Sequence, residues 1–170
     1  MNSNLLFYFS VNKENKTIHI KREFDANLNL VWQAWTTPEL LDQWWAPKPY
    51  RNKTKSLDFK KGGTWHYAMI SPENETNWCR FDYQDIVTQK SFSGLDAFCD
   101  ENGNINTDFS RMLWQNIFSA TPDRTIVNIT VTVDTFETLE KIIAMGFKEG
   151  FTMGLQQLDE LLLTLNNNPK

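Results

Sequence analysis

Apolar residues near the end of the chain recur at intervals of three and four, which is the spacing of one face of a helix. The pattern runs from Phe136 to Leu163 and predicts one long amphipathic helix. Gly146, Gly150 and Gly154 lie four residues apart within it. Each interior glycine costs a helix about 1 kcal/mol relative to alanine. The stripe therefore indicates either close packing of another element on this helix or the wall of a ligand cavity.

Strict alternation of apolar and polar residues predicts strands through most of the remaining chain. An N-terminal pair is expected at 5–11 and 17–24, joined by a polar turn at 12–16. Further strands are expected around residues 65–69, 79–83, 92–98, 111–119 and 127–133. Short turns between successive strands favour an antiparallel meander, and the last helix is the one long amphipathic element that can cover it.

Two short helices are predicted between the N-terminal strands and the meander. Residues 28–35 have helical spacing, and Thr37 and Pro38 are placed as the N-cap and first residue of the second helix. Pro47 ends that helix. Trp44 and Trp45 beside it are expected to be exposed, where they could form a pocket lid or a dimer contact.

Length and composition indicate one aromatic-rich domain. The chain has 170 residues, of which 41% are hydrophobic, with seven Trp, twelve Phe and four Tyr. Such rings fill large cores and also line pockets. We expect residues 1–16 to be an N-terminal extension with an extra strand, 17–165 to be the domain, and 166–170 to be a disordered tail.

Charge and cysteine content narrow the class of protein. A net charge of −4 argues against a nucleic-acid partner, and the chain has no uncharged apolar run of about 18 residues that could cross a membrane. Without a recognisable secretion signal, a cytoplasmic location is expected. Basic residues between 48 and 61 fit either a lysine-protected edge strand or a phosphate-binding patch. Cys79 and Cys99 are expected to be reduced, although a hairpin turn at 88–90 could bring them opposite each other.

The sequence carries no recognisable catalytic or metal-binding pattern. His19 and His66 lie on different predicted strands, without metal-ligand spacing, and are expected on exposed strand faces. No phosphate loop, nucleophile with a base, or cofactor motif is present. We therefore expect no catalytic residue, no metal and no cofactor. Arg80 could form a surface ion pair with Asp82. Alternatively, it could lie at a pocket mouth and bind the acidic head group of a ligand.

Several short segments, in this order, carry a family resemblance. They are FDA at 24–26, VWQAWTTPEL at 31–40, WWAP at 44–47, GGTW at 62–65, WCRFDYQDIV at 78–87 and the helix pattern at 150–158. The chain resembles the START-like (SRPBCC, Bet v-type) helix-grip superfamily. Within it, the chain is most similar to small bacterial proteins related to the C-terminal domain of the activator of the heat-shock chaperone ATPase.

The resemblance implies an α+β helix-grip fold. A curved antiparallel sheet of about six or seven strands would wrap around a long C-terminal helix, with two short helices after the N-terminal strands. A cavity between sheet and helix would hold a small apolar, aromatic or lipid-like ligand. The alternatives are a regulator of a chaperone ATPase, by analogy alone, and a cyclase or hydrolase that uses the same cavity. The absence of a recognisable acid–base pair weighs against an enzyme. Monomer and homodimer both stay open.

Aromatic and glycine positions on the inward faces supply the candidate site residues. Ordinary core packing accounts for some of them, and the sequence does not separate the two groups. The expected ligand-binding residues are Trp65, Tyr67, Phe81, Tyr83, Trp114, Phe147, Gly150, Phe151 and Gly154, with Trp45 and Arg80 at the pocket mouth.

Overall fold

The computed structural model describes residues 5–167, which form one antiparallel sheet and four helices. The elements in chain order are β1 (Phe7–Asn12), β2 (Thr17–Phe24), α1 (Leu28–Thr36), α2 (Pro38–Leu41), β3 (Arg51–Leu57), β4 (Thr64–Ile70), β5 (Thr76–Val87), β6 (Ser91–Phe98), β7 (Leu113–Ala120), β8 (Thr125–Thr132), α3 (Phe136–Ala144) and α4 (Phe147–Asn167). The strand order in the sheet is β1-β2-β8-β7-β6-β5-β4-β3.

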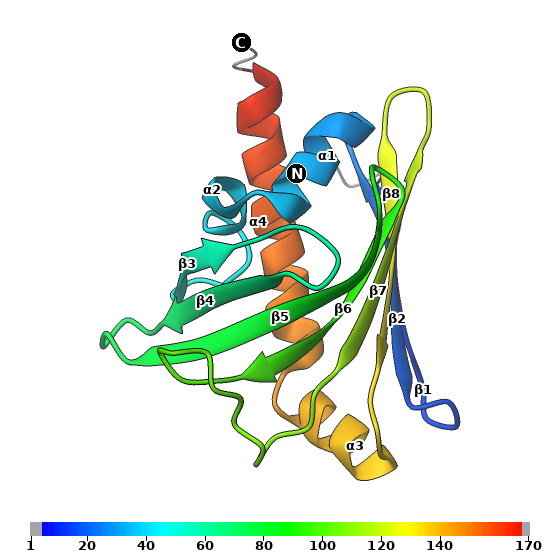
Figure 1. The fold of residues 1–170 in the computed structure, drawn as a ribbon. Helices are drawn as coiled ribbons and strands as arrows, with labels where there is room; N and C mark the ends of the chain where they lie inside the picture. The colour runs from blue at the N-terminus through cyan, green and yellow to red at the C-terminus, as the bar shows by residue number, and fades with distance from the viewer. Residues whose placement is uncertain (1–4, 168–170) are drawn as a thin grey trace.

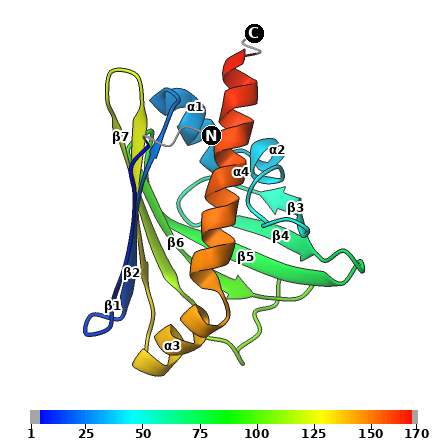
Figure 2. The same ribbon diagram turned by 180° about the vertical axis from the view of Figure 1, so that it is seen from behind.

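The sheet curves around helix α4, which crosses its inner face (Figures 1 and 2). Helices α1 and α2 cover one end of this face, and α3 lies at the opposite end. This is the expected helix-grip arrangement, but the sheet has eight strands and not six or seven. The edge strand β1, which pairs with β2, lies within the predicted N-terminal pair, and β3, which pairs with β4, is the additional strand at the other edge.

The exposed edge of β3 accounts for part of the basic cluster. Arg51, Lys53 and Lys55 alternate along it and are exposed, while Asn52 between them is buried. Charged side chains on an edge strand oppose pairing with another sheet. The placement therefore fits the edge-strand interpretation of these residues.

The prediction of one unbroken helix from Phe136 to Leu163 is wrong. Helix α3 ends at Ala144, and α4 begins at Phe147. Between them Gly146 has a φ of +92°, and its N–H donates to the Ile143 carbonyl at 3.1 Å. Glycine commonly ends a helix in this left-handed conformation because it has no Cβ to clash. The first glycine of the stripe is thus a helix terminator.

The third glycine allows the backbone of the α2–β3 connection to approach α4. A Cβ on Gly154 would lie 3.4 Å from the Trp44 carbonyl oxygen and 3.6 Å from that of Trp45. One turn further on, the buried Gln157 amide donates to the carbonyls of Trp44, at 3.0 Å, and Ala46, at 2.9 Å. These contacts fix the connection against the helix.

The two tryptophans before Pro47 are not exposed as predicted. Trp44 is 1% exposed, and its Nε1 donates to the Ala34 carbonyl at 2.9 Å. Trp45 is half-buried and packs edge-on against Trp44 and Trp65. Both rings point inward because α2 folds back on α1 and brings this segment over the open end of the sheet.

A buried ion pair joins the sheet to α4. Arg22 Nη2 of β2 donates to Asp159 Oδ2, and the side chains are 6% and 10% exposed. Arg22 also lies 5.0 Å from the centroid of the Phe24 ring. The pair locks the C-terminal half of α4 onto β2, at the end of the sheet away from α3.

The structure corrects two smaller predictions, on His66 and on the end of α4, and it decides between the alternatives for the two cysteines, which are free as expected. Cys79 pairs with Phe98 and not with Cys99, so the thiols fall on opposite faces of the sheet and both are free. His66 is 8% exposed, because its Nε2 meets the Asp100 carbonyl at 3.1 Å beneath the β6–β7 loop. Helix α4 continues to Asn167, into the segment expected to be a tail, and residues 168–170 lie outside the described residues. No helix within residues 5–167 has the length and hydropathy needed to cross a membrane.

Candidate functional site

A cavity of about 690 Å³ lies between the inner face of the sheet and the two C-terminal helices. Strands β4 to β7 form its floor, while α3, the start of α4 and the β6–β7 loop form its sides. Its volume falls within the range of small-molecule sites. The lining is rich in aromatic rings: Trp45, Tyr67, Phe81, Phe98, Phe109, Trp114, Phe147 and Phe151.

Strand register brings the floor residues together. Tyr67 of β4 pairs with Cys79 of β5, and Phe81 pairs with Asp96 of β6, so all four side chains share the inner face. Gly94 leaves room for the Phe81 ring, because a Cβ there would lie only 2.4 Å from Phe81 Cε1. This missing side chain on β6 therefore shapes the floor.

Tyr67 and Cys79 supply uncharged polar groups to the floor. Trp45 Nε1 donates to the Tyr67 hydroxyl at 3.3 Å. Burial raises the pKa of Tyr67 well above its ordinary value and raises the pKa of Cys79 to about 12. Both groups are neutral at physiological pH, so the hydroxyl can hydrogen-bond to a ligand and the thiol behaves as a small apolar surface.

Asp96 supplies a carboxylate to the same cavity. It accepts hydrogen bonds from the Met112 backbone N–H at 2.8 Å and from Trp114 Nε1 at 2.9 Å. Burial raises the pKa of Asp96, while these donors and the charge of Arg111 act in the opposite direction. A carboxyl in such a setting can accept a proton, donate one, or pair with a ligand cation.

The sequence reasoning missed Asp96, although a signal was present. Asp96 has the same strand parity as Phe92 and Gly94, and Phe92 is in the core. An acidic residue on the inward parity of a strand is unusual, because buried carboxylates are costly without partners. The other missed wall residues are on the β6–β7 loop and α3, where no periodic pattern shows which side chains face a cavity.

A smaller void of about 20 Å³ lies further inside, under α1 and α2. Trp65, Tyr83 and Phe92 line it. Trp45 and Trp114 line both this void and the main cavity, so their rings stand between the two. The cavity thus ends inside the molecule at a layer of packed rings.

The predicted ligand-binding residues are divided between the main cavity, the small void and the contact of α4 with the α2–β3 connection. Those that line the main cavity are Tyr67, Phe81, Trp114, Phe147, Gly150 and Phe151. Trp65 and Tyr83 line the small void instead, and Gly154 faces the backbone of the α2–β3 connection. Trp45 lines the main cavity at its inner end and not at its mouth.

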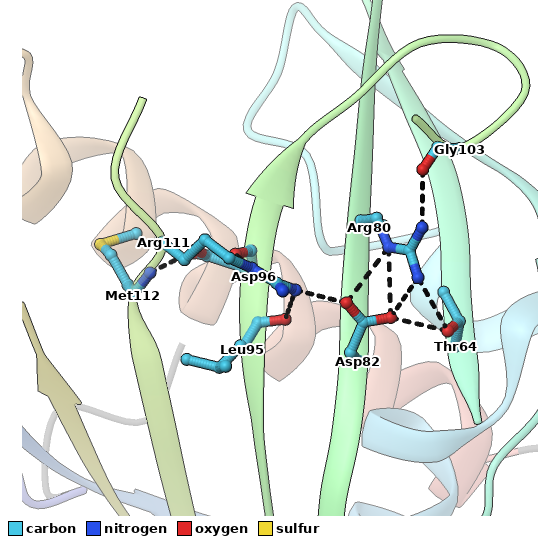
Figure 3. Close-up of polar contacts among 8 residues, drawn as sticks. All are labelled: Thr64, Arg80, Asp82, Leu95, Asp96, Gly103, Arg111 and Met112. Carbon is cyan, nitrogen blue, oxygen red and sulfur yellow. Dashed lines mark hydrogen bonds and ion pairs between the residues drawn. The ribbon is translucent and has the colours of Figure 1, made fainter. Parts of the chain in front are cut away.

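Arg80 lies on the outer face of the sheet, away from the cavity (Figure 3). Its Nη2 bonds Asp82 Oδ1 at 2.6 Å and its Nη1 donates to the Gly103 carbonyl at 2.6 Å. Arg111 and Thr64 also donate to Asp82. This corresponds to the surface ion pair foreseen as the alternative to a head-group role, extended by a second arginine.

Exposed side chains form the rim of the cavity at the end nearest α3. Phe98 and Phe109 meet edge-on at 5.0 Å between ring centroids, and Lys141 Nζ lies 5.5 Å from the Phe109 centroid. Glu137 and Met145 also belong to the lining. Neither here nor elsewhere in residues 5–167 is there a cluster of three or more His, Cys, Asp or Glu side chains that could hold a metal ion.

Comparison with known proteins agrees with this architecture. Residues 25–163 match the family described as Activator of Hsp90 ATPase homolog 1-like protein. The chain belongs to this family. The match spans α3, most of α4 and all strands of the cavity floor. The family match supports the START-like resemblance. In general terms it therefore also supports a ligand-binding domain. A chaperone-regulating role for this chain stays a prediction.

Solved structures of three bacterial proteins share the fold. Protein Ms6760 from Mycobacterium smegmatis is 27% identical, with a TM-score of 0.84 over 93% of this chain and 96% of that one. A protein from Arthrobacter aurescens is 25% identical, with a TM-score of 0.87 over 92% and 91%. A protein from Staphylococcus epidermidis is 27% identical, with a TM-score of 0.82 over 91% and 94%. No curated protein matches the chain.

Proposed function

We propose that this chain is a binding module that holds a small, mostly apolar, aromatic or lipid-like ligand in the main cavity. The observation that carries the proposal is the cavity itself, about 690 Å³ in volume and lined largely by rings. Apolar walls with a few convergent polar groups are typical of small-molecule sites. At the floor of this cavity the polar groups include the Tyr67 hydroxyl and the Asp96 carboxylate.

The break between α3 and α4 supports the proposal. Gly146 ends α3, so the chain turns and α3 caps the end of the sheet, while α4 crosses its inner face. Gly150, one turn into α4, lines the cavity and has no side chain to occupy it. Phe147 and Phe151 on either side of it stack with centroids 5.7 Å apart, along the helical wall. The helix break and the missing side chain at Gly150 therefore leave open the space that forms the cavity.

The test is a titration of the whole chain with naphthylmethanol, a neutral aromatic probe, followed by tryptophan fluorescence and calorimetry. Because Trp45 and Trp114 line the cavity, binding should quench fluorescence saturably with one probe per chain. Gly150→Phe should weaken binding at least about tenfold by placing a ring in the cavity. Its Cβ would meet only Pro47 Cγ, at 3.8 Å, so the helix should tolerate the change.

Met153→Phe is the matched control. It adds a ring on the same helix at a residue that is 43% exposed and outside the lining, and it should bind like the parent chain. Absence of saturable binding by the parent chain, for the naphthyl probe and for a long-chain alcohol alike, would disprove the proposal. Equal affinity for folded Gly150→Phe would also disprove it.

A further inference from the structure

We infer that the ligand of this cavity is an organic cation, an amine whose protonated nitrogen is held by Asp96 among the aromatic rings. The inference rests on the proposed function and assigns the chemical class of the ligand. The apolar body of the amine would occupy the ring-lined part of the cavity, and its ammonium group would lie over the floor at β6.

Asp96 forms no ion pair with any side chain in the part of the chain that the structure describes. The nearest candidate, Arg111, directs its Nη2 to Asp82 and the Leu95 carbonyl, and its Nε to the Asp96 backbone carbonyl. A carboxylate has about four acceptor positions, and two N–H donors occupy two of them. Asp96 therefore keeps acceptor capacity toward the cavity it lines.

Aromatic rings surround the Asp96 carboxylate at the cavity floor. Trp114 donates to Asp96 through its edge and also lines the cavity, and its centroid is 5.6 Å from that of Phe151. Phe81 is the cross-strand partner of Asp96, and Tyr67 lies one strand beyond. Cations are attracted to the faces of such rings within about 6 Å of the centroid. A carboxylate with aromatic walls is thus suited to an ammonium group.

The charged side chains of the cavity lining are mostly acidic. It contains three acidic side chains, Asp96, Asp108 and Glu137, and one basic side chain, Lys141. Lys141 is exposed at the rim, over the Phe109 ring, whereas Asp96 is at the floor. A ligand carboxylate that entered the cavity would meet like charge without a buried cation to pair with. The lining therefore selects against anions such as fatty acids.

The experiment compares three probes of matched size by calorimetry: naphthylmethylamine, naphthylmethanol and naphthoate. The amine should bind the parent chain about tenfold or more tighter than the alcohol, and naphthoate should bind weakest. In Asp96→Asn the amine should lose this advantage while the alcohol still binds. Asp108→Asn is the matched control, because it removes a rim carboxylate and should keep most of the preference for the amine.

A pH series on the parent chain tests the inference even if Asp96→Asn does not fold. The advantage of the amine over the alcohol should vanish as pH falls through the pKa of Asp96, which burial raises above that of an ordinary aspartate. The other ionisable groups that line the cavity or bear on Asp96 are Tyr67, Cys79, Asp108, Glu137, Lys141 and Arg111. Asp108→Asn together with Glu137→Gln removes the other two carboxylates of the lining, and this variant should still lose the advantage of the amine at acid pH.

Two results would overturn the inference and leave the proposed function intact. One is equal or tighter binding of the alcohol or naphthoate, and the other is an amine preference that survives in folded Asp96→Asn. If none of the three probes binds, the proposed function fails and the inference fails with it.

Discussion

The indole nitrogen of Trp114 donates a hydrogen bond of 2.9 Å to the carboxylate of Asp96, across β7 and β6. The contact joins the largest ring of the cavity floor to the carboxylate that lines it. It also stabilises the charged form of a carboxyl whose pKa burial raises. The ionisation of Asp96 therefore depends on this ring.

Trp114→Phe should raise the pKa of Asp96 further, because the ring stays and the donor is lost. The free energy of unfolding should fall by about 1–2 kcal/mol from the lost hydrogen bond and the smaller ring. Carboxyl-carbon NMR of Asp96 across a pH series measures the first effect. Trp78→Phe, on the outer face beside His66, should leave that titration unchanged, and an equal shift in both variants would contradict the assignment.

Alanine at two glycines of the same stripe should have opposite effects. Gly146 has a φ of +92°, so Gly146→Ala should lower the free energy of unfolding by about 1–2 kcal/mol. Gly150 is within α4, and its Cβ would touch only Pro47 Cγ at 3.8 Å. Gly150→Ala should therefore raise the stability by up to about 1 kcal/mol. Urea unfolding measures both, and destabilisation of similar size at both positions would show that the helix does not break at Gly146.

The same two glycines show what the sequence could and could not predict. Apolar spacing continues on both sides of the break, from Ile142 and Ile143 to Phe147 and Phe151, so periodicity alone predicts one helix. Only the positive φ of Gly146, which the fold imposes, separates α3 from α4. By contrast, the alternation through 127–133 predicts β8 nearly to its ends, because one face of that strand is fully buried.

The site was predictable only where a side chain belongs to a regular element. Tyr67 and Phe81 are identified by strand parity, and Phe151 by helix periodicity. Parity also places Arg80 on the outer face, as the structure has it. Asp108 and Phe109 line the cavity from an irregular loop. Their position depends on strand register and on where the β6–β7 loop folds, which local sequence patterns do not encode.

Removing one partner of the Arg22–Asp159 ion pair should strongly lower the free energy of unfolding. Asp159→Leu leaves the Arg22 guanidinium buried without a counter-charge, and should lower the free energy of unfolding by about 3–5 kcal/mol. Replacing both partners, with Arg22→Met and Asp159→Leu, should recover most of that loss because no unpaired charge is left. Chemical denaturation of the single and double variants forms the test. Additive losses in the double variant would show that the two side chains are not coupled.

The outer-face cluster should make stability depend on pH in the acid range. Burial opposes ionisation of Asp82, but hydrogen bonds from Arg80, Thr64 and Arg111 outweigh it and hold its pKa below the ordinary value. Its stabilising contribution is therefore complete above the unfolded pKa of about 3.9 and is lost as pH falls through the lower folded pKa. Asp82→Asn should cost about 1 kcal/mol at neutral pH, since the group is partly exposed.

Unfolding of Asp82→Asn and the parent chain at several pH values below about 5 measures this contribution, because the variant should lose part of the acid dependence. Asp58→Asn is a suitable control, because Asp58 forms only a loose pair with Lys60 at 3.4 Å between exposed side chains. A larger effect from Asp58 than from Asp82 would contradict the role of the cluster.

The most direct test of the central claim is an NMR titration that follows the seven tryptophan indole N–H signals of the ¹⁵N-labelled chain while naphthylmethanol is added. Single Trp→Phe variants assign the signals. Ligand binding in the cavity predicts that the signals of Trp45 and Trp114 shift saturably while that of Trp78, on the outer face, stays in place. A shift of Trp78 without Trp45 and Trp114, or no saturable shift of any signal, would contradict binding in this cavity.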